Sequence, residues 1–206
     1  MSDKNHWEGL YAEQEHRSLS WYQDSAHRSL KLIERFAPAK TSAIIDIGGG
    51  ASVLSAELLQ RDYCRLSVLD ISHAALAVAR ARLGERADLV DWLEKDIGSA
   101  DLARAGFDLW HDRAVFHFMV DEAARRAYVD CALNAVRPSG HLIIATFAED
   151  GPEQCSGLPV ARYDATLLAA QFGAACTLIH SETETHRTPT GRAQHFRYCV
   201  LCRGRE

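Results

Sequence analysis

Residues 42–52 read SAIIDIGGGAS, a short run rich in isoleucine that ends in three consecutive glycines. Such a run predicts a buried strand over 42–47, and the apolar pattern that follows predicts a helix over 53–59. Glycines between a strand and a helix let the backbone approach a ligand closely, and the helix N-terminus offers free N–H groups. This turn is therefore the first place to expect a binding site.

The alternation of strand, turn and helix continues on both sides of this turn. The predicted helices lie at 25–36, 53–59, 72–83, 121–136 and 164–172, and the predicted strands at 42–47, 65–69, 89–93, 107–110, 141–147, 176–181 and 196–202. Such alternation predicts an α/β fold: a Rossmann-like, doubly wound, mostly parallel seven-stranded sheet with helices on both faces. No helix separates the last two strands, so we expect them to form an antiparallel hairpin at the sheet edge. This domain would span 25–206, after an N-terminal aromatic segment at 1–24.

The composition indicates an ordinary globular chain with an acidic balance. Its 206 residues are 47% hydrophobic and 25% charged, with a formal net charge of -5. This charge argues against nucleic acid as the main partner, because phosphate binding favours a basic face. No apolar run resembles a signal peptide or a membrane span, so we expect a cytoplasmic protein without a membrane partner. Six dispersed cysteines indicate structural thiols, and we expect no metal site.

Asp46 stands two residues before the first glycine, at the end of the first predicted strand. A carboxylate there would repel a pyrophosphate, whereas a cationic ligand would gain roughly several kcal/mol relative to that repulsion at a separation of ~4 Å. The dinucleotide fingerprint also requires a small third residue where Val53 stands. S-adenosylmethionine carries an ammonium and a sulfonium and no phosphate, so it fits an acid beside a glycine turn. The alternative is that Asp46 only caps the loop.

A second acid, Asp70, ends the second predicted strand, and its carboxylate can accept two hydrogen bonds from ribose hydroxyls. Asp70 alone does not separate NAD from S-adenosylmethionine, but together with Asp46 it does. Ile71 would lie beside the adenine ring. Asp96-Ile97 follows the third strand, where Asp96 can pair with the adenine amino group or act only as a helix cap.

The segments IIDIGGGAS, VLDIS, EKDI, LWHDRAVFHF and VRPSGHLIIATF resemble the class I S-adenosylmethionine-dependent methyltransferases from about residue 42 to 147. The resemblance implies that the glycine turn, Gly48, Gly49 and Gly50, contacts the methionine and ribose portions of the cofactor, whose product is S-adenosylhomocysteine. It places Asp46 at the amino-acid end of the cofactor, with Asp70 at the ribose and Asp96 at the adenine.

His111-Asp112-Arg113 follows the fourth strand, at the edge that faces the methyl group in this family. Methyl transfer is an in-line displacement that positioning accelerates, and a base is needed only if the acceptor arrives protonated. Asp112 and Arg113 are candidate catalytic residues, and Asp112 is also a candidate for the ammonium of the cofactor. His117 or His111 could accept a proton, although a histidine in such an apolar segment is often a hydrogen-bonded core residue.

Two groups of methyltransferases are comparable in the acceptor region. Trp7, Tyr11 and Trp21-Tyr22 resemble the N-terminal aromatics of thiopurine and thiol methyltransferases, and Asp112-Arg113-Ala114 resembles their D-R-G-A segment. In that case Trp21 and Tyr22 would flank the sulfonium through cation–π contact, as part of a lid; alternatively they pack the first helix onto the sheet. Protein-lysine methyltransferases have a D-K-G-T-x-D segment here, but His117 replaces its final acid.

The leading hypothesis is a methyltransferase for a small-molecule acceptor, such as a thiol. Protein-lysine methylation and a non-catalytic cofactor-binding domain are the alternatives, and Asp46 disfavours an NAD-dependent reductase. The loop 150–159 is long enough to form an acceptor wall, although a nucleophilic role for its Cys155 would need a lowered pKa and a base partner. The sequence does not indicate an oligomeric state.

Overall fold

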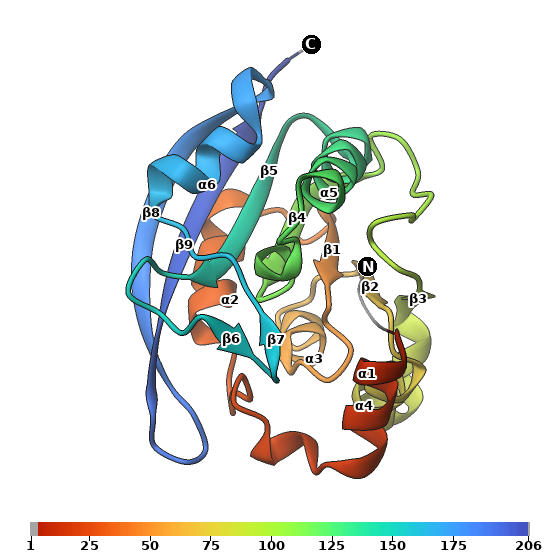
Figure 1. Cartoon of the computed structure of the whole chain (residues 1–206). Coiled ribbons are helices and arrows are strands. Elements are labelled where there is room, and N and C mark those ends of the chain that lie inside the picture. Colours follow the sequence, from red (N-terminus) through yellow and green to blue (C-terminus); the bar gives the residue numbers. More distant parts are fainter. Residues whose placement is uncertain (1–3, 206) are drawn as a thin grey trace.

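The computed structural model describes residues 4–205 and contains one central sheet with helices on both faces (Figure 1). Its strands are β1 Ala43–Ile47, β2 Arg65–Asp70, β3 Val90–Glu94, β4 Phe107–Arg113, β5 Val136–Phe147, β8 Cys176–Arg187 and β9 Ala193–Arg203. Its α-helices are α1 Lys4–Glu13, α2 His27–Phe36, α3 Leu54–Leu59, α4 His73–Leu83, α5 Glu122–Ala135 and α6 Ala165–Gln171, and a small hairpin joins β6 Gln154–Cys155 to β7 Leu158–Pro159. No helix within the described residues is both long and apolar enough to cross a bilayer.

The sheet order is β3-β2-β1-β4-β5-β9-β8. Strands β1 to β5 pair in parallel, whereas β9 is antiparallel to both β5 and β8. The predicted doubly wound fold with an antiparallel hairpin is therefore confirmed. Strand β1 lies between β2 and β4, so the chain reverses its direction of winding there, and ligands in such folds bind beyond the carboxyl ends of the strands at that point.

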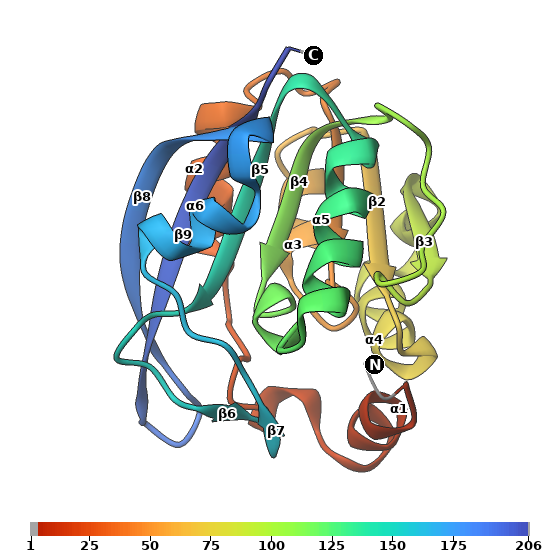
Figure 2. The same cartoon turned by 45° about the horizontal axis from the view of Figure 1, so that its top comes forward.

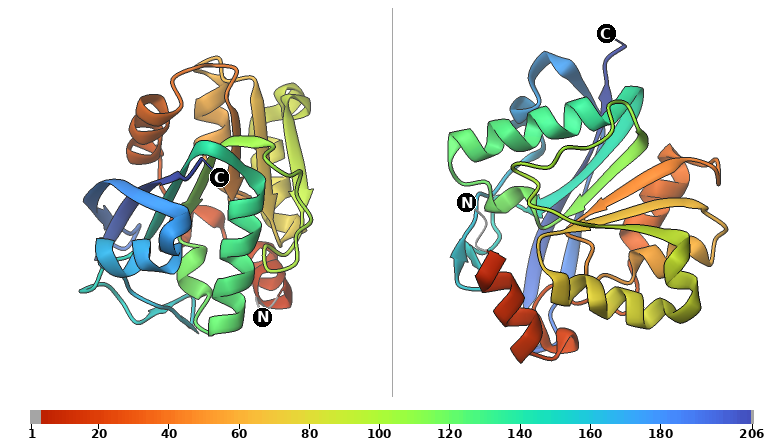
Figure 3. Two further views of the ribbon diagram at one scale, coloured as in Figure 1. Left: turned by 90° about the horizontal axis from the view of Figure 1, so that it is seen from above. Right: turned by 90° about the vertical axis from the view of Figure 1, so that its right-hand side faces the viewer.

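Two hydrophobic cores lie on the opposite faces of the sheet. Helices α2, α3 and α4 cover one face, and α5 and α6 cover the other, as the rotated views show (Figures 2 and 3). Along β1, Ile44 faces the first core, whereas Ile45 and Ile47 face the second. The two-residue period of a strand therefore turns Asp46 toward α2.

The N-terminal segment contains a helix, α1, that the sequence pattern did not predict. It lies at the carboxyl end of the sheet, beside the start of α4 (Figure 1). Glu8 of α1 accepts a hydrogen bond from the Ser72 hydroxyl (2.6 Å) and one from the Ala74 backbone N–H (3.2 Å). This carboxylate stabilises the N-terminus of α4, where negative charge is favourable, and so holds α1 against the domain.

Candidate functional site

The glycine turn leaves no room for side chains. Gly48 has a φ of +65°, and a Cβ on it would collide with the side chain of Val115. A Cβ on Gly50 would lie 2.6 Å from the Asp70 carboxylate, whose Oδ2 accepts a hydrogen bond from the Gly50 N–H (3.0 Å). The turn therefore requires glycine at these two positions, and its backbone lies directly against the second-strand acid.

Two adjoining cavities open at this edge of the sheet. The first is lined by Asp70 and Ile71 after β2, Lys95 and Ile97 after β3, and residues from the N-terminal segment and from the end of β4. The second contains Asp46, His111 and Ser29 together with the glycine turn. The residues that line both cavities are Tyr11, Trp21, Ile47, Gly48 and Arg113. The two cavities therefore meet between the N-terminal aromatics, the glycine turn and the end of β4.

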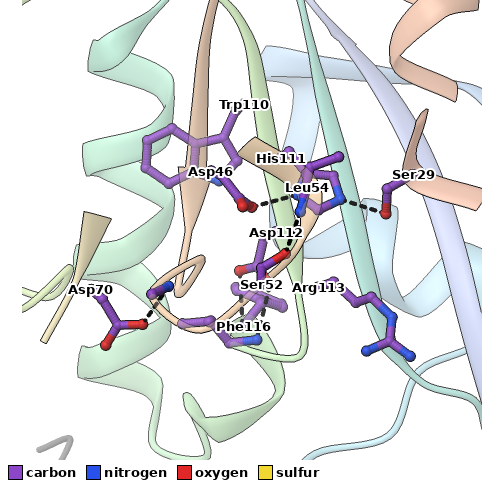
Figure 4. Close-up of polar contacts among 12 residues, drawn as sticks. Ser29, Asp46, Ser52, Leu54, Asp70, Trp110, His111, Asp112, Arg113 and Phe116 are labelled. Carbon is purple, nitrogen blue, oxygen red and sulfur yellow. Dashed lines mark hydrogen bonds and ion pairs between the residues drawn. The ribbon is translucent and has the colours of Figure 1, made fainter. Parts of the chain in front are cut away.

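Asp46 is 4% exposed, and only one of its carboxylate oxygens is paired. Oδ1 lies 2.7 Å from Nδ1 of His111, and Nε2 of that ring lies 2.8 Å from the Ser29 hydroxyl (Figure 4). Oδ2 has no hydrogen-bond partner among the described residues. An unpaired buried carboxylate oxygen is costly, so this atom is suited to a donor that a ligand brings.

Asp70 is 7% exposed and accepts backbone hydrogen bonds from Gly50 and from Ser72 (2.9 Å). Burial raises the pKa of its carboxyl to about 6, although the N–H donors oppose this shift. Asp96 instead accepts a hydrogen bond from the Gly98 N–H (2.9 Å) and does not line either cavity, whereas the neighbouring Ile97 lines the first.

Asp112 faces away from both cavities. The alternation along β4 turns it toward α5, where its carboxylate accepts hydrogen bonds from the Val115 N–H (2.9 Å), the Phe116 N–H (3.0 Å) and the Tyr128 hydroxyl. It is 0% exposed, and burial raises its pKa to about 6. In this structure the carboxylate holds the turn after β4, and neither an acceptor nor an ammonium in the two cavities would meet it.

We expect Asp112→Asn to lower the free energy of unfolding by about 2–3 kcal/mol, because an amide NH₂ would face a backbone N–H or the tyrosine hydroxyl and leave a buried donor unpaired. Urea unfolding measures this change. The exposed Asp91 provides a control, and Asp91→Asn should shift the unfolding free energy by less than ~0.5 kcal/mol. A fully stable Asp112→Asn variant that had lost cofactor affinity would instead assign Asp112 to the binding site.

Arg113 is the charged side chain at the junction of the two cavities, and its side chain is 9% exposed. Nε donates to the Tyr198 hydroxyl (3.1 Å), Nη1 donates to the Trp21 carbonyl (3.3 Å), and the guanidinium stacks 4.2 Å from the Phe196 ring centroid. Nη2 is buried without a hydrogen-bond partner among the described residues and forms an ion pair with Oε2 of Glu184, at 3.7 Å. The guanidinium is thus held in place by contacts on several sides.

His117 is enclosed by the Phe118 and Phe147 rings and is 0% exposed. Burial lowers its pKa to about 3, so the ring is neutral at physiological pH. Nδ1 accepts a hydrogen bond from the Phe147 N–H (3.4 Å), and the residue lines neither cavity. His117 could therefore accept a proton from a ligand only after a rearrangement that exposed its ring to one of the cavities.

The N-terminal aromatics form the roof of the first cavity. The Trp7 ring contacts those of Trp21 and Phe118 edge-on, at centroid distances of 5.9 and 5.1 Å, and Nε1 of Trp21 donates to the Tyr11 hydroxyl (3.2 Å). Tyr22 lies apart from this group and lines only the second cavity. The sequence showed the aromatic residues but not the helix that brings Trp7 and Tyr11 together, because α1 depends on contacts with α4.

Cys155, on the β6–β7 hairpin, lines the first cavity and is 4% exposed. Burial raises the pKa of its thiol to about 12, so it is a thiol rather than a nucleophilic thiolate at neutral pH. Ser29, by contrast, lines the second cavity although no sequence pattern singled it out. The only signal was a hydroxyl on the apolar face of α2, beside Leu30 and Ile33.

The sheet order, the glycine turn and the acids at the carboxyl ends of β1 and β2 define a Rossmann-like nucleotide-binding domain. A family model described as a methyltransferase domain matches residues 44–140. Among curated proteins, EEF1A lysine methyltransferase 2 of Danio rerio is 26% identical, over 71% of this chain and 69% of its own. An uncharacterized methyltransferase of Mycobacterium tuberculosis is 30% identical over 116 residues, which are 56% of each chain.

Solved structures share the fold. One, described under the conversion of a disulfide bond into a thioacetal group during echinomycin biosynthesis, aligns over 98% of this chain and 92% of its own, with a TM-score of 0.79 and 18% identity. The N-methyltransferase NodS of Bradyrhizobium japonicum, in complex with S-adenosylhomocysteine, covers 88% of this chain and 89% of its own, with a TM-score of 0.67 and 18% identity. The family model, the curated relatives and the shared fold together support a class I S-adenosylmethionine-dependent methyltransferase.

Proposed function

We propose that the two cavities together hold S-adenosylmethionine, with the amino-acid end in the second cavity and the adenosine in the first. The unpaired Oδ2 of Asp46 supports this, because it offers a buried negative charge to a cationic amino group. In the first cavity Asp70 would accept hydrogen bonds from the ribose hydroxyls, and Ile71 and Ile97 would contact the adenine ring. When bound, the cofactor supplies an electrophilic methyl group on a positively charged sulfur.

The acceptor site we propose is the junction of the two cavities, where Arg113 meets the aromatic roof. Trp21 and Tyr11 line this junction and would exclude water from it, which is what an in-line displacement requires. Because Trp7, Tyr11 and Trp21 form this roof, we propose that the N-terminal segment, 1–24, is a lid over the methyltransferase domain. Trp21 is also the aromatic residue that could contact the sulfonium, whereas Tyr22 would meet only the amino-acid end.

A small thiol is the acceptor that the charge of this junction supports best. Its reactive form is the thiolate, and a buried guanidinium favours that form by lowering the pKa of a nearby thiol. Arg113 would thus prepare the acceptor without a protein base, and neither His117 nor Cys155 is needed. The structural neighbour concerned with sulfur chemistry in echinomycin biosynthesis is consistent with such a substrate class.

The relative that methylates a lysine motivates protein-lysine methylation as the second candidate. A lysine acceptor arrives as an ammonium, so it needs a carboxylate to attract it and a base to deprotonate it. The first cavity instead contains Arg113 and Lys95, and Asp70, the one carboxylate among the described residues that line it, is committed to the cofactor in this proposal. Charge repulsion therefore disfavours a lysine acceptor at the junction.

We expect the affinity for S-adenosylhomocysteine to fall as the pH is lowered below about 6. The raised pKa of Asp70 means that its carboxylate is protonated in this range, and a neutral carboxyl is the weaker acceptor for ribose hydroxyls. Where Asp70 of the free protein is protonated, cofactor binding releases one proton, so the affinity falls by at most about tenfold per pH unit. Calorimetric titration between pH 5 and pH 8 checks this. In the Asp70→Asn variant the affinity should no longer fall as the pH is lowered through this range. An affinity with the same pH dependence in both proteins would contradict it.

A panel of thiols, amines and carboxylates, assayed for release of S-adenosylhomocysteine, tests the acceptor proposal. Turnover should be confined to thiols. A parallel incubation of the protein with a cell lysate and methyl-labelled cofactor should yield label in small molecules and none in polypeptides. Labelled polypeptides would support the lysine alternative, and tight cofactor binding without turnover on any acceptor would support a non-catalytic domain.

A further inference from the structure

Asp46, His111 and Ser29 form a buried chain of hydrogen bonds beside the second cavity. Asp46 and His111 lie opposite each other on β1 and β4, and their side chains meet on the face of the sheet that α2 covers. Ser29 reaches the other side of the imidazole from α2. The three residues are 4%, 3% and 1% exposed, so their contacts with one another are shielded from bulk solvent (Figure 4).

The chemistry of the partners assigns one proton of this chain. An ionised carboxylate can only accept, so Nδ1 of His111 carries the hydrogen and donates to Oδ1 of Asp46. Nε2 of the ring lies 2.8 Å from the Ser29 hydroxyl, which can either donate to this nitrogen or accept from it. In both cases His111 occupies only Oδ1 of Asp46, and the buried Oδ2 keeps no hydrogen-bond partner among the described residues.

We propose that His111, held between Asp46 and Ser29, is a positioning residue that aims Asp46 at the cationic amino group of the cofactor. The inference rests on the proposed placement of the amino-acid end in the second cavity. A lone aspartate can rotate about two side-chain bonds, whereas a carboxylate with one oxygen bound by a fixed imidazole presents the other oxygen in one direction. The same three residue types occur in hydrolytic triads, but Ser29 points inward from α2 and is 1% exposed, so its hydroxyl is not open to an acyl substrate.

Two ligands that differ only at the amino-acid end separate positioning from a general structural role. S-adenosylhomocysteine contains the amino group, and 5′-methylthioadenosine lacks the whole amino-acid end. Calorimetry should show His111→Leu weakening S-adenosylhomocysteine about tenfold or more, with 5′-methylthioadenosine changed less than about twofold. His111→Asn retains a donor toward Asp46 and should recover most of the affinity, and Ser29→Ala should produce a smaller loss with the same ligand selectivity.

Equal losses for both ligands in these variants, or no loss for S-adenosylhomocysteine, would overturn the positioning role. If His111→Leu does not fold, as thermal unfolding would reveal, His111→Asn and Ser29→Ala carry the test, and a Ser29→Ala variant without ligand selectivity overturns it. The wild-type protein tests the proposed function separately. If it bound 5′-methylthioadenosine as tightly as S-adenosylhomocysteine, the contact between Asp46 and the amino group would itself be wrong.

Discussion

Asp46→Asn should weaken the binding of S-adenosylmethionine about 100-fold or more while leaving the free protein as stable as the wild type, or more stable. The substitution removes the buried negative charge that we assign to the amino group of the cofactor, and contacts between charged groups are each worth about 1.5–3 kcal/mol. The asparagine oxygen can still accept a hydrogen bond from His111. The asparagine NH₂ would then take the place of Oδ2 and point a donor at the cationic amino group of the cofactor. The free protein loses an unpaired buried carboxylate oxygen, which is costly to keep.

Titration calorimetry and thermal unfolding measure the two halves of this prediction. The surface carboxylate Asp91 again provides a matched control, because it is exposed on β3, and Asp91→Asn should change neither quantity. Unchanged cofactor affinity in Asp46→Asn would mean that this acid only caps the glycine turn. A large loss of stability together with the loss of affinity would mean that its role is structural.

Arg113→Met should lower kcat/KM for a thiol acceptor about 100-fold, with the affinity for S-adenosylhomocysteine changed less than about threefold. Methionine retains an apolar stem that can pack on Phe196, so the loss reports on the guanidinium rather than on packing. We also expect the pH profile of kcat/KM to move to higher pH, because the acceptor thiol loses the cation that favours its thiolate.

Arg113→Lys distinguishes charge from geometry, since lysine keeps the charge but not the planar set of donors. It should recover part of the low-pH activity if charge stabilises the thiolate. Stopped assays across the thiol panel, with calorimetry on the same proteins, provide the measurements. Two results would contradict the assignment. One is an unshifted pH profile; the other is a loss confined to cofactor affinity, which would assign Arg113 to the cofactor carboxylate.

The sequence predicted the sheet, and it predicted that Asp46 and Asp70 stand at the carboxyl ends of β1 and β2, because both features depend on local patterns. The run that ends in Asp46 and three glycines specifies a strand, a turn and a close backbone approach without reference to any other segment. The hairpin at the sheet edge followed from the lack of a helix between the last two strands. These strands are longer than predicted, because β8 and β9 continue past the apolar core as a paired ribbon to Arg187 and Ala193.

The directions in which His111 and Asp112 point could not be predicted from the sequence. Both follow the apolar part of the fourth strand, and a shift of one residue exchanges the two faces of a strand. The structure turns His111 toward Asp46 and turns Asp112 toward Tyr128 of α5, a partner 16 residues further along the chain. The helix α1 was missed for a similar reason, since Glu8 binds the start of α4, 64 residues further along the chain.

The most direct measurement is a crystal structure of the protein with S-adenosylhomocysteine bound. We expect the amino group within hydrogen-bonding distance of Oδ2 of Asp46, the ribose hydroxyls on Asp70, and the sulfur at the junction of the two cavities beside Arg113. A ligand whose amino group lay away from Asp46, or whose sulfur faced a surface other than this junction, would contradict the account.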